Sequence, residues 1–340
     1  MTKRRKPDDA KENYAPSKPG DKEESKARGG EDGPVGAILE TGAPPAKLTE
    51  FDFKTLPENF FVVCYGARRT GKSWLMNHAL AELKDRFDYA YCFSATAALN
   101  DGFPAVRPEA VFNDFDEGIL SQLMARQKAW VEHNKNVKHK ADEIKCSTLL
   151  IFDDFVHNVQ VRYSQQFVQL PVLGRHYKLS CVLLSQGYGA VASGGLNPAT
   201  RMNADAVITF MPRSTLDCQK IAEWYLTMPK KEGGEFVKAQ TAEKHRALVV
   251  DLQDPSDIDE ASFCHTVKAP SSKVKPYELG KEQWRQFRIS NRAKKEYLRH
   301  LRNDNEEVSL EEAQRVNLGG APFVGLSKAI TDMGMSVHGL

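Results

Sequence analysis

Short apolar runs alternate with longer segments of helical pattern between about residues 58 and 252. Within the runs, apolar residues follow one another without a polar residue at every second position. This pattern is typical of strands buried on both faces of a parallel sheet. The runs that we expect to form strands are 59–65, 89–94, 147–154, 181–186, 206–210 and, at an edge of the sheet, 247–252.

Helical segments separate several of these strands. One is expected over residues 72–86, and another around 120–131, where apolar residues recur at helical spacing. Strands that alternate with helices predict an α/β fold, in which helices cover both faces of a mostly parallel sheet.

The two ends of the chain differ in composition from this central region. Residues 1–47 are rich in Lys, Glu, Asp, Pro and Gly, and are too poor in apolar residues to offset the entropy of ordering, so we expect a disordered tail. The basic run at 3–6 is either a solvated terminus or a nuclear localisation patch. We therefore expect a tail over 1–47, one α/β domain over 48–254, and a basic helical or irregular extension over 255–340.

Charge and cysteine content limit the partners and the compartment. The formal net charge is +2, so any attraction to nucleic acid must be local. The six cysteines lie far apart without metal-site spacing, and those in apolar runs are expected to be buried free thiols, which favours a reducing compartment. No apolar run approaches the length that crosses a bilayer and the N-terminal residues lack an apolar signal core, so we expect neither a membrane span nor a secretory signal.

A glycine-rich stretch, GARRTGKS, connects the first expected strand to the first expected helix and fits G-x-x-x-x-G-K-[ST]. Its glycines allow a tight turn in which backbone N–H groups point at phosphate oxygens, and the helix N-terminus adds positive dipole. In such a loop Lys72 reaches the β- and γ-phosphates of ATP, and the Ser73 hydroxyl is a ligand of Mg²⁺. The expected nucleotide-binding residues are Gly66, Ala67, Arg68, Arg69, Thr70, Gly71, Lys72 and Ser73.

Two aspartates close the buried run 147–154. Asp153 is the expected second Mg²⁺ ligand, opposite Ser73. Asp154 lies where open α/β sheets bind their ligands, and is expected to orient or polarise the attacking water. The alternative interpretation is that both aspartates are solvated and cap the following helix.

A glutamine follows the strand expected at 181–186. Gln186 should lie beside the phosphates, because its strand is expected next to the acidic one, and its amide can sense the γ-phosphate. A second carboxylate and an additional strand between the motifs are typical of hydrolysing P-loop NTPases of the ASCE or RecA-like type. A nucleotide kinase must exclude water, whereas a hydrolase must position it.

The chain resembles the FtsK/HerA superfamily of ring-forming DNA translocases, and within it the poxvirus-type genome-packaging ATPases. The stretches that carry the resemblance are GARRTGKS, LLIFDD, GRHYKLSCVLLSQ and NPATRMNADAVITF. The resemblance implies a homo-oligomeric ring of five or six subunits with double-stranded DNA in its channel and ATP sites between subunits. It assigns the sensor role to Gln186, and it implies an arginine that completes the neighbouring subunit's site. Arg175 is the first choice for this arginine and Arg201 the second.

The expected function is thus an ATP-driven motor that packages viral double-stranded DNA, with a capsid or portal protein as partner. Such a protein acts at an assembly site in the host cytoplasm or nucleus, or in the virion. A cellular or plasmid translocase of the same superfamily, a P-loop kinase and a nucleotide-binding structural protein are the alternatives. The basic segment 281–303, with interleaved aromatics, either contacts DNA phosphates or docks on the ATPase domain.

Overall fold

The structure is a computed structural model of the 340-residue chain. It describes residues 47–96, 102–154, 161, 163–188, 196–254, 259–286, 288 and 292. The expected disordered tail, except for residue 47, lies outside the described residues. So do residues 293–303 of the basic segment and everything that follows them.

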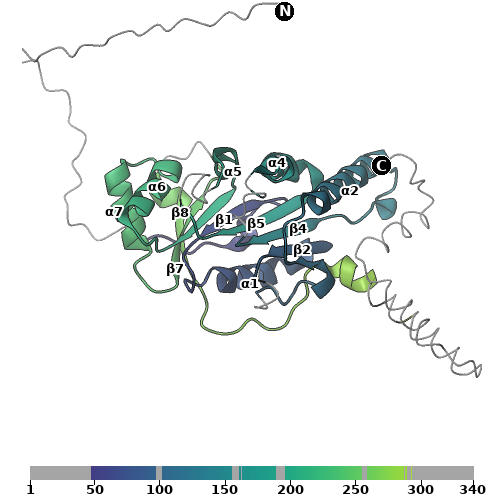
Figure 1. The fold of residues 1–340 in the computed structure, drawn as a ribbon, viewed down its shortest axis with the longest axis horizontal. Coiled ribbons are helices and arrows are strands. Elements are labelled where there is room, and N and C mark those ends of the chain that lie inside the picture. Colours follow the sequence, from purple (N-terminus) through teal and green to yellow (C-terminus); the bar gives the residue numbers. More distant parts are fainter. Residues whose placement is uncertain are drawn as a thin grey trace, which may run out of the picture. The chain divides into compact units, whose positions relative to one another are not determined.

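In the part of the chain that the structure describes, eight strands form one sheet in the order β3-β2-β4-β5-β1-β6-β7-β8 (Figure 1). Strands β1 to β6 pair in parallel, whereas β7 and β8 join at one side by antiparallel pairing. The bounds are β1 Phe61–Tyr65, β2 Tyr89–Ser94, β3 Val111–Phe112, β4 Thr148–Asp153, β5 Leu179–Ser185, β6 Ala206–Phe210, β7 Arg246–Asp251 and β8 Cys264–Lys268.

Every strand expected from the apolar runs is present, but the position expected for 247–252 is wrong. Strand β7 is not at the edge of the sheet, because β8 pairs with its outer side. Residues 49–51 in turn form backbone hydrogen bonds with Thr266 of β8. The sheet therefore continues beyond residue 254, and the expected C-terminal extension contributes a strand to it.

Helices cover both faces of the sheet, which confirms the expected α/β class. In Figure 1, α1 lies on one face, and α2, α4 and α5 lie on the other. The α-helices are α1 Lys72–Leu83, α2 Glu117–Asn136, α4 Gln165–Leu173, α5 Pro198–Met202, α6 Thr215–Tyr225, α7 Lys230–Gln240 and α8 Glu260–Phe263. The 3₁₀ turns are η1 Phe53–Thr55, η2 Lys84–Arg86, η3 Pro108–Ala110, η4 Lys140–Asp142 and η6 Gly174–Tyr177. The helix expected over 72–86 is thus α1 followed by the turn η2.

The central strands are buried on both faces, as their composition predicts. Every residue of β1, β2, β4, β5 and β6 is buried. All six cysteines are buried and free, and burial raises the pKa of the Cys64 thiol to about 12. None of the helices in the described ranges has the length and apolar character needed to cross a membrane.

The helices α6 and α7 form a hairpin between β6 and β7, and two glycines let them pack closely. A Cβ at Gly233 would lie 2.6 Å from the Cβ of Ala222, and a Cβ at Gly234 would lie 2.8 Å from the Cγ of Gln219. Since contacts this short are not tolerated, larger residues at these two positions would push the helices apart.

Residues 269–281, which we call the strap, run along α1 after β8. The carbonyl oxygens of Pro270 and Ser272 accept hydrogen bonds from the Trp74 and His78 rings of α1. The Tyr277 hydroxyl donates to the Asn77 carbonyl at 2.8 Å. Beyond it, Leu279 is fully buried and donates from its backbone to the Ala105 carbonyl, and the Lys281 backbone donates to Phe87. The strap therefore attaches the chain after β8 to the helix that follows β1.

Candidate functional site

The segments that follow β1, β4 and β5 meet at the end of the sheet where these parallel strands have their carboxyl termini. Strand β5 lies between the other two, with Tyr65 of β1 opposite Ser185 and Asp153 of β4 opposite Leu184. Because the three strands are parallel, their carboxyl ends lie together. The glycine-rich loop, the two aspartates and the glutamine are thereby brought to one place, as the sequence predicts.

The loop 66–71 requires glycine at both ends for steric reasons. A Cβ at Gly66 would lie 2.7 Å from the Thr70 Oγ1 and 3.0 Å from the Phe210 Cβ. Gly71 has a φ of 109°, which L side chains rarely adopt. Arg69 also has a left-handed φ, of 63°. The backbone therefore turns tightly between β1 and α1, as a phosphate-binding loop requires.

The Lys72 side chain is folded over this loop. It is 7% exposed, and its Nζ donates to the carbonyl oxygens of Gly66 at 2.6 Å and Ala67 at 3.1 Å. A buried ammonium group beside the loop's backbone is positioned to pair with phosphate charge.

Burial lowers the pKa of Lys72, and it is the largest cause of the shift. Electrostatic interactions with Cys64, Asp154 and Asp153 oppose the shift, whereas Arg213 adds to it. Arg213 follows β6, is exposed, and was not singled out from the sequence. No motif marks it, and only the pairing of β6 with β1 brings it into the electrostatic range of Lys72.

Asp153 is buried at the end of β4. Burial, and secondarily the charge on Asp154, raises its pKa to about 6, while Lys72 and a hydrogen bond from Ser94 act in the opposite direction. Ser94 ends β2, the strand beside β4, and was also missed in the sequence. Together with the Ser73 hydroxyl, the Asp153 carboxylate supplies oxygen ligands of the kind that Mg²⁺ prefers.

This donor set suits magnesium better than zinc. Within the described residues, no group of three His, Cys, Asp or Glu side chains is placed to hold a metal ion. Mg²⁺ needs no such cage, because one or two protein oxygens are enough when phosphates and water complete its coordination. The expected pair of Ser73 and Asp153 therefore fits this ion.

Asp154 and Gln186 are in direct contact. The Gln186 Nε2 donates to the Asp154 Oδ1 at 2.6 Å. Asp154 has a left-handed φ of 60°, so the chain turns immediately after β4 and directs this carboxylate toward the residue that follows β5. Residues 155–160 lie outside the described ranges, so the alternative that these aspartates cap a helix stays untested.

Further contacts support the two residues that we expect to bind Mg²⁺, Ser73 and Asp153. Asn77 of α1 donates to the carbonyl oxygens of Ser73 at 2.8 Å and Gly102 at 2.6 Å. A Cβ at Gly102 would lie 3.7 Å from the Asp153 Oδ2, so this loop passes over the carboxylate. No motif indicates the contact between Asn77 and Gly102, which joins residues 25 positions apart.

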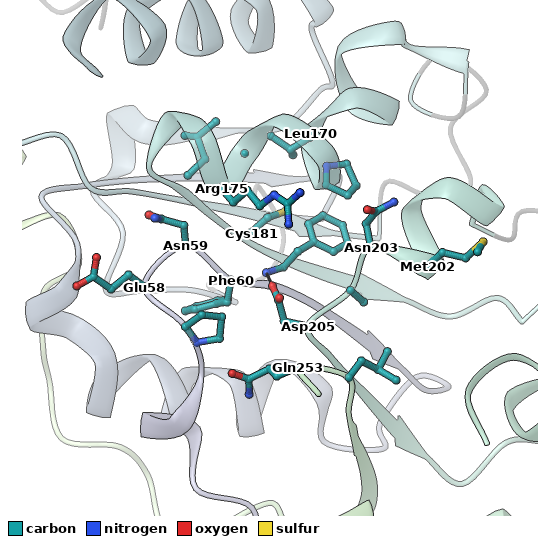
Figure 2. Close-up of a pocket in the computed structure, with 17 residues that line it drawn as sticks. Glu58, Asn59, Phe60, Leu170, Arg175, Cys181, Met202, Asn203, Asp205 and Gln253 are labelled. Carbon is teal, nitrogen blue, oxygen red and sulfur yellow. Dashed lines mark hydrogen bonds between the residues drawn. The ribbon is translucent and has the colours of Figure 1, made fainter. Parts of the chain in front are cut away.

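Arg175 lies at the opposite end of the sheet, where the parallel strands begin, in η6 just before β5. It lines a pocket of about 560 Å³ with Asn203, Asp205 and the first residues of β1 and β5 (Figure 2). The Asp205 carboxylate accepts from the Phe61 backbone N–H at 2.6 Å. Burial raises the pKa of Asp205, and this hydrogen bond and the charge on Arg175 act against the increase. Because it lies where its strand begins, Arg175 is not placed to reach the phosphate loop of its own chain.

Arg201, the second choice, already has partners. Its guanidinium lies 3.8 Å from the centre of the Trp224 ring, and its Nη1 donates to the Leu196 carbonyl at 3.4 Å. Stacking and hydrogen bonding both hold this side chain on its own subunit, which favours Arg175 for a role toward a neighbour.

The described start of the basic segment is docked on the domain. Arg107 lies over the Trp284 ring at 5.7 Å, and Gln286 donates to the Tyr89 hydroxyl. Arg285 and Arg288 form ion pairs with Glu282 and Glu278. These contacts agree with the docking interpretation for this portion. For the part after residue 292, both docking and contact with DNA phosphates stay predictions.

Comparison with known proteins identifies a similar family. Residues 48–207 match the sequence model of the Poxvirus A32 protein family. Over these residues the chain is similar to that family. The resemblance inferred from the sequence is thereby confirmed, and with the phosphate loop and acidic strand in their required places this is a P-loop ATPase domain of the viral genome-packaging type.

Two further groups of proteins are similar. An uncharacterized protein of Acanthamoeba polyphaga mimivirus, L437, is 26% identical over 215 residues, which cover 62% of this chain and 73% of that protein. The genome packaging NTPase B204 of Sulfolobus turreted icosahedral virus 2, solved with ATP-gammaS, is 18% identical, with a TM-score of 0.44 over 63% of this chain and 100% of that one. The pCW3 conjugation coupling protein TcpA is 13% identical, with a TM-score of 0.44 over 62% and 60%. Both TM-scores lie below 0.5, so no function is transferred from either structure.

Proposed function

We propose that the protein hydrolyses ATP with Mg²⁺ and uses the energy to move double-stranded viral DNA into a capsid. The observation that carries the proposal is the contact between Gln186 and Asp154 beside the phosphate loop. A carboxylate at this position can polarise water, and the amide that holds it can respond to the γ-phosphate. The match of residues 48–207 to the Poxvirus A32 protein family supports the same interpretation.

Each residue of the site has a definite task in this reaction. The backbone of residues 66–73 and the Lys72 ammonium bind the phosphates, and Ser73 and Asp153 hold Mg²⁺, which neutralises charge on the β- and γ-phosphates. Asp154 orients the attacking water as a general base would. Gln186 fixes the carboxylate of Asp154 through its Nε2, so a change at the γ-phosphate is passed to the strand β5.

Arg175 acts in the site of a neighbouring subunit in this proposal. Arg175 lies at the end of the strands opposite the phosphate loop. This position suits a head-to-tail arrangement, in which the end of one subunit that carries the Arg175 pocket meets the end of the next subunit that binds the nucleotide. Such heterologous contacts generate rings when the rotation closes. An arginine supplied in trans stabilises charge that develops on the γ-phosphate, an effect worth about 10³–10⁵ in rate.

The remaining assignments follow from the packaging role. Double-stranded DNA is the substrate of the motor, the ring has five or six subunits, and a capsid or portal protein receives the DNA. The assembly site in the host cytoplasm or nucleus is the proposed place of action.

The test is ATP hydrolysis by the full chain, measured with and without duplex DNA. We expect hydrolysis that duplex DNA stimulates, and a loss of about 100-fold in Asp154→Asn with ATP binding retained, since a positioned general base contributes about 10²–10⁴. Asp114→Asn, at an exposed position before α2, is the matched control and should behave like the parent. Transfer of phosphate to a nucleoside monophosphate instead of water would contradict the proposal and favour a kinase.

A further inference from the structure

A histidine from a distant part of the chain holds the phosphate loop. His245 lies in the turn between α7 and β7, and its Nδ1 is 2.9 Å from the Thr70 carbonyl oxygen. The two residues are 175 positions apart. The family match ends at residue 207, so this contact comes from a part of the chain beyond it.

The direction of the hydrogen bond follows from the chemistry of the acceptor. A carbonyl oxygen has no hydrogen to donate, so Nδ1 must carry the hydrogen. This requirement fixes the orientation of the imidazole ring, and excludes the neutral tautomer that is protonated on Nε2 alone.

The same contact determines where the next backbone amide points. The peptide bond between Thr70 and Gly71 is trans, so its C=O and N–H groups point in opposite directions. With the carbonyl directed at His245, the Gly71 N–H is directed away from His245. Among the described residues, none accepts a hydrogen bond from this N–H.

The surroundings of Gly71 leave the histidine little freedom to move. A Cβ at Gly71 would lie 3.3 Å from the Ala269 Cβ, 3.4 Å from the His245 Nδ1 and 3.6 Å from the Phe210 Cε1. The His245 backbone carbonyl accepts from the Ala269 N–H at 2.9 Å. His245 has a left-handed φ of 65°, which lets its side chain face the loop while its carbonyl faces the start of the strap.

We propose that His245 is a positioning residue of the phosphate loop: by holding the Thr70 carbonyl outward, it aims the Gly71 N–H at a nucleotide phosphate. The residue touches no phosphate itself. The inference rests on the proposed function, since it concerns the binding of ATP or ADP at this loop.

The test compares a variant that lacks the side chain with one whose shorter side chain keeps a hydrogen-bond donor. Glycine and asparagine both tolerate a left-handed φ, and the asparagine Nδ2 occupies the same place along the side chain as the histidine Nδ1. We expect His245→Gly to weaken ADP binding about tenfold by titration calorimetry, since hydrogen bonds to charged groups are among the stronger ones. His245→Asn should recover most of this loss. His139→Asn is the control: this histidine is exposed and far from His245 in the sequence, so the change should leave ADP binding unchanged.

Steady-state hydrolysis supplies a second readout that a purely structural role would not produce. An amide that binds the ground state and the transition state alike affects KM, so His245→Gly should raise KM about tenfold and change kcat less than twofold. A folded His245→Gly variant that binds ADP like the parent would overturn the inference. So would equal losses in the Gly and Asn variants, which would assign the effect to the ring and not to the hydrogen bond.

A measurement on the unmodified protein avoids any problem of folding. Nitrogen-15 NMR of histidine distinguishes a protonated Nδ1 from a bare one, and we expect the His245 Nδ1 to be protonated. A bare Nδ1 would refute the proposal whatever the variants do. If the parent protein bound no ADP or ATP, the proposed function itself would fail, and the inference with it.

Discussion

Replacing Asp153 by asparagine should stabilise the nucleotide-free protein while it removes a magnesium ligand. Burial, more than the neighbouring Asp154 charge, raises the pKa of Asp153 to about 6, against an ordinary value of 3.8. Between these two values the folded state binds a proton that the unfolded state has released. The free energy of unfolding therefore falls as the pH rises from about 4 to 6, and the loss is complete at neutral pH.

The magnitude follows from the size of the shift. One unit of pKa corresponds to about 1.4 kcal/mol, so a shift of about 2 units destabilises the folded protein by up to about 3 kcal/mol at pH 7. An asparagine side chain at this position would be close in shape to the carboxylate and would carry no charge. Asp153→Asn should thus raise the free energy of unfolding at pH 7 by about 1–3 kcal/mol, and the difference from the parent should shrink toward pH 4.

The assay is urea unfolding of the parent and the variant between pH 4 and 8, without nucleotide or divalent cations. The exposed Asp114→Asn serves again as the control, and its unfolding curve should follow that of the parent at each pH. If Asp153→Asn were no more stable than the parent at pH 7, or if the difference were the same at all pH values, the reasoning from burial would be refuted. The same carboxylate must be ionised to hold Mg²⁺, so hydrolysis by the parent at limiting Mg²⁺ should fall as the pH drops through about 6.

Three further outcomes are expected. Gln186→Ala should slow hydrolysis about 10- to 100-fold with little change in ADP affinity, because Asp154 loses a charge-assisted hydrogen bond at 2.6 Å; an unchanged single-turnover rate would speak against this. Arg175→Ala and Lys72→Ala subunits, each inactive alone, should recover some hydrolysis when mixed, and no recovery in verified mixed assemblies would exclude Arg175 as the residue that acts in trans. Ending the chain after residue 292 should preserve hydrolysis without DNA and flatten the salt dependence of duplex binding, by about 0.9 in slope for each DNA phosphate that is no longer neutralised; an equal slope would assign DNA binding elsewhere.

The contacts of the strap determine where the chain can be shortened without disturbing the ATPase domain. A cut near residue 270, where the apolar pattern has faded, looks harmless in the sequence. However, Leu279 is fully buried and the strap is bonded to α1, so such a cut would disturb the helix that follows the phosphate loop. A cut after residue 292 leaves these interactions in place.

The central strands could be predicted because burial on both faces requires unbroken apolar runs, which are visible in the sequence. Strand β8 could not, since its sequence, CHTVK, mixes polar and apolar residues and its last residue is exposed. The hairpin of α6 and α7 was missed for a related reason, because Gly233 and Gly234 look like breaks in a helix until their close contacts with α6 are seen.

The residues of the site also fall into those that the sequence indicates and those that only the structure reveals. The loop, the two aspartates and Gln186 each carry a local motif, and the order of parallel strands brings them together. Ser94, Arg213 and His245 carry none, because each reaches the site through a strand or turn whose neighbours are set by tertiary pairing. Arg175 was named by resemblance, and only the structure shows that it precedes a strand whose other end carries Gln186.

The strap also affects how the protein opens locally. The rings of Trp74 and His78 in α1 are hydrogen-bonded to backbone carbonyls of the strap, and the Tyr277 hydroxyl of the strap donates to a backbone carbonyl of α1. Helix α1 therefore cannot lose its structure on its own while the strap stays attached, nor can the strap detach without exposing the side of α1 that it contacts. Amide hydrogens in the two segments should exchange as one cooperative unit, although the bonded residues Asn77 and Tyr277 are 200 positions apart. The phosphate-binding helix is in this way protected from fraying by a segment that is synthesised much later, so the nucleotide site gains its full rigidity only after the strap has left the ribosome.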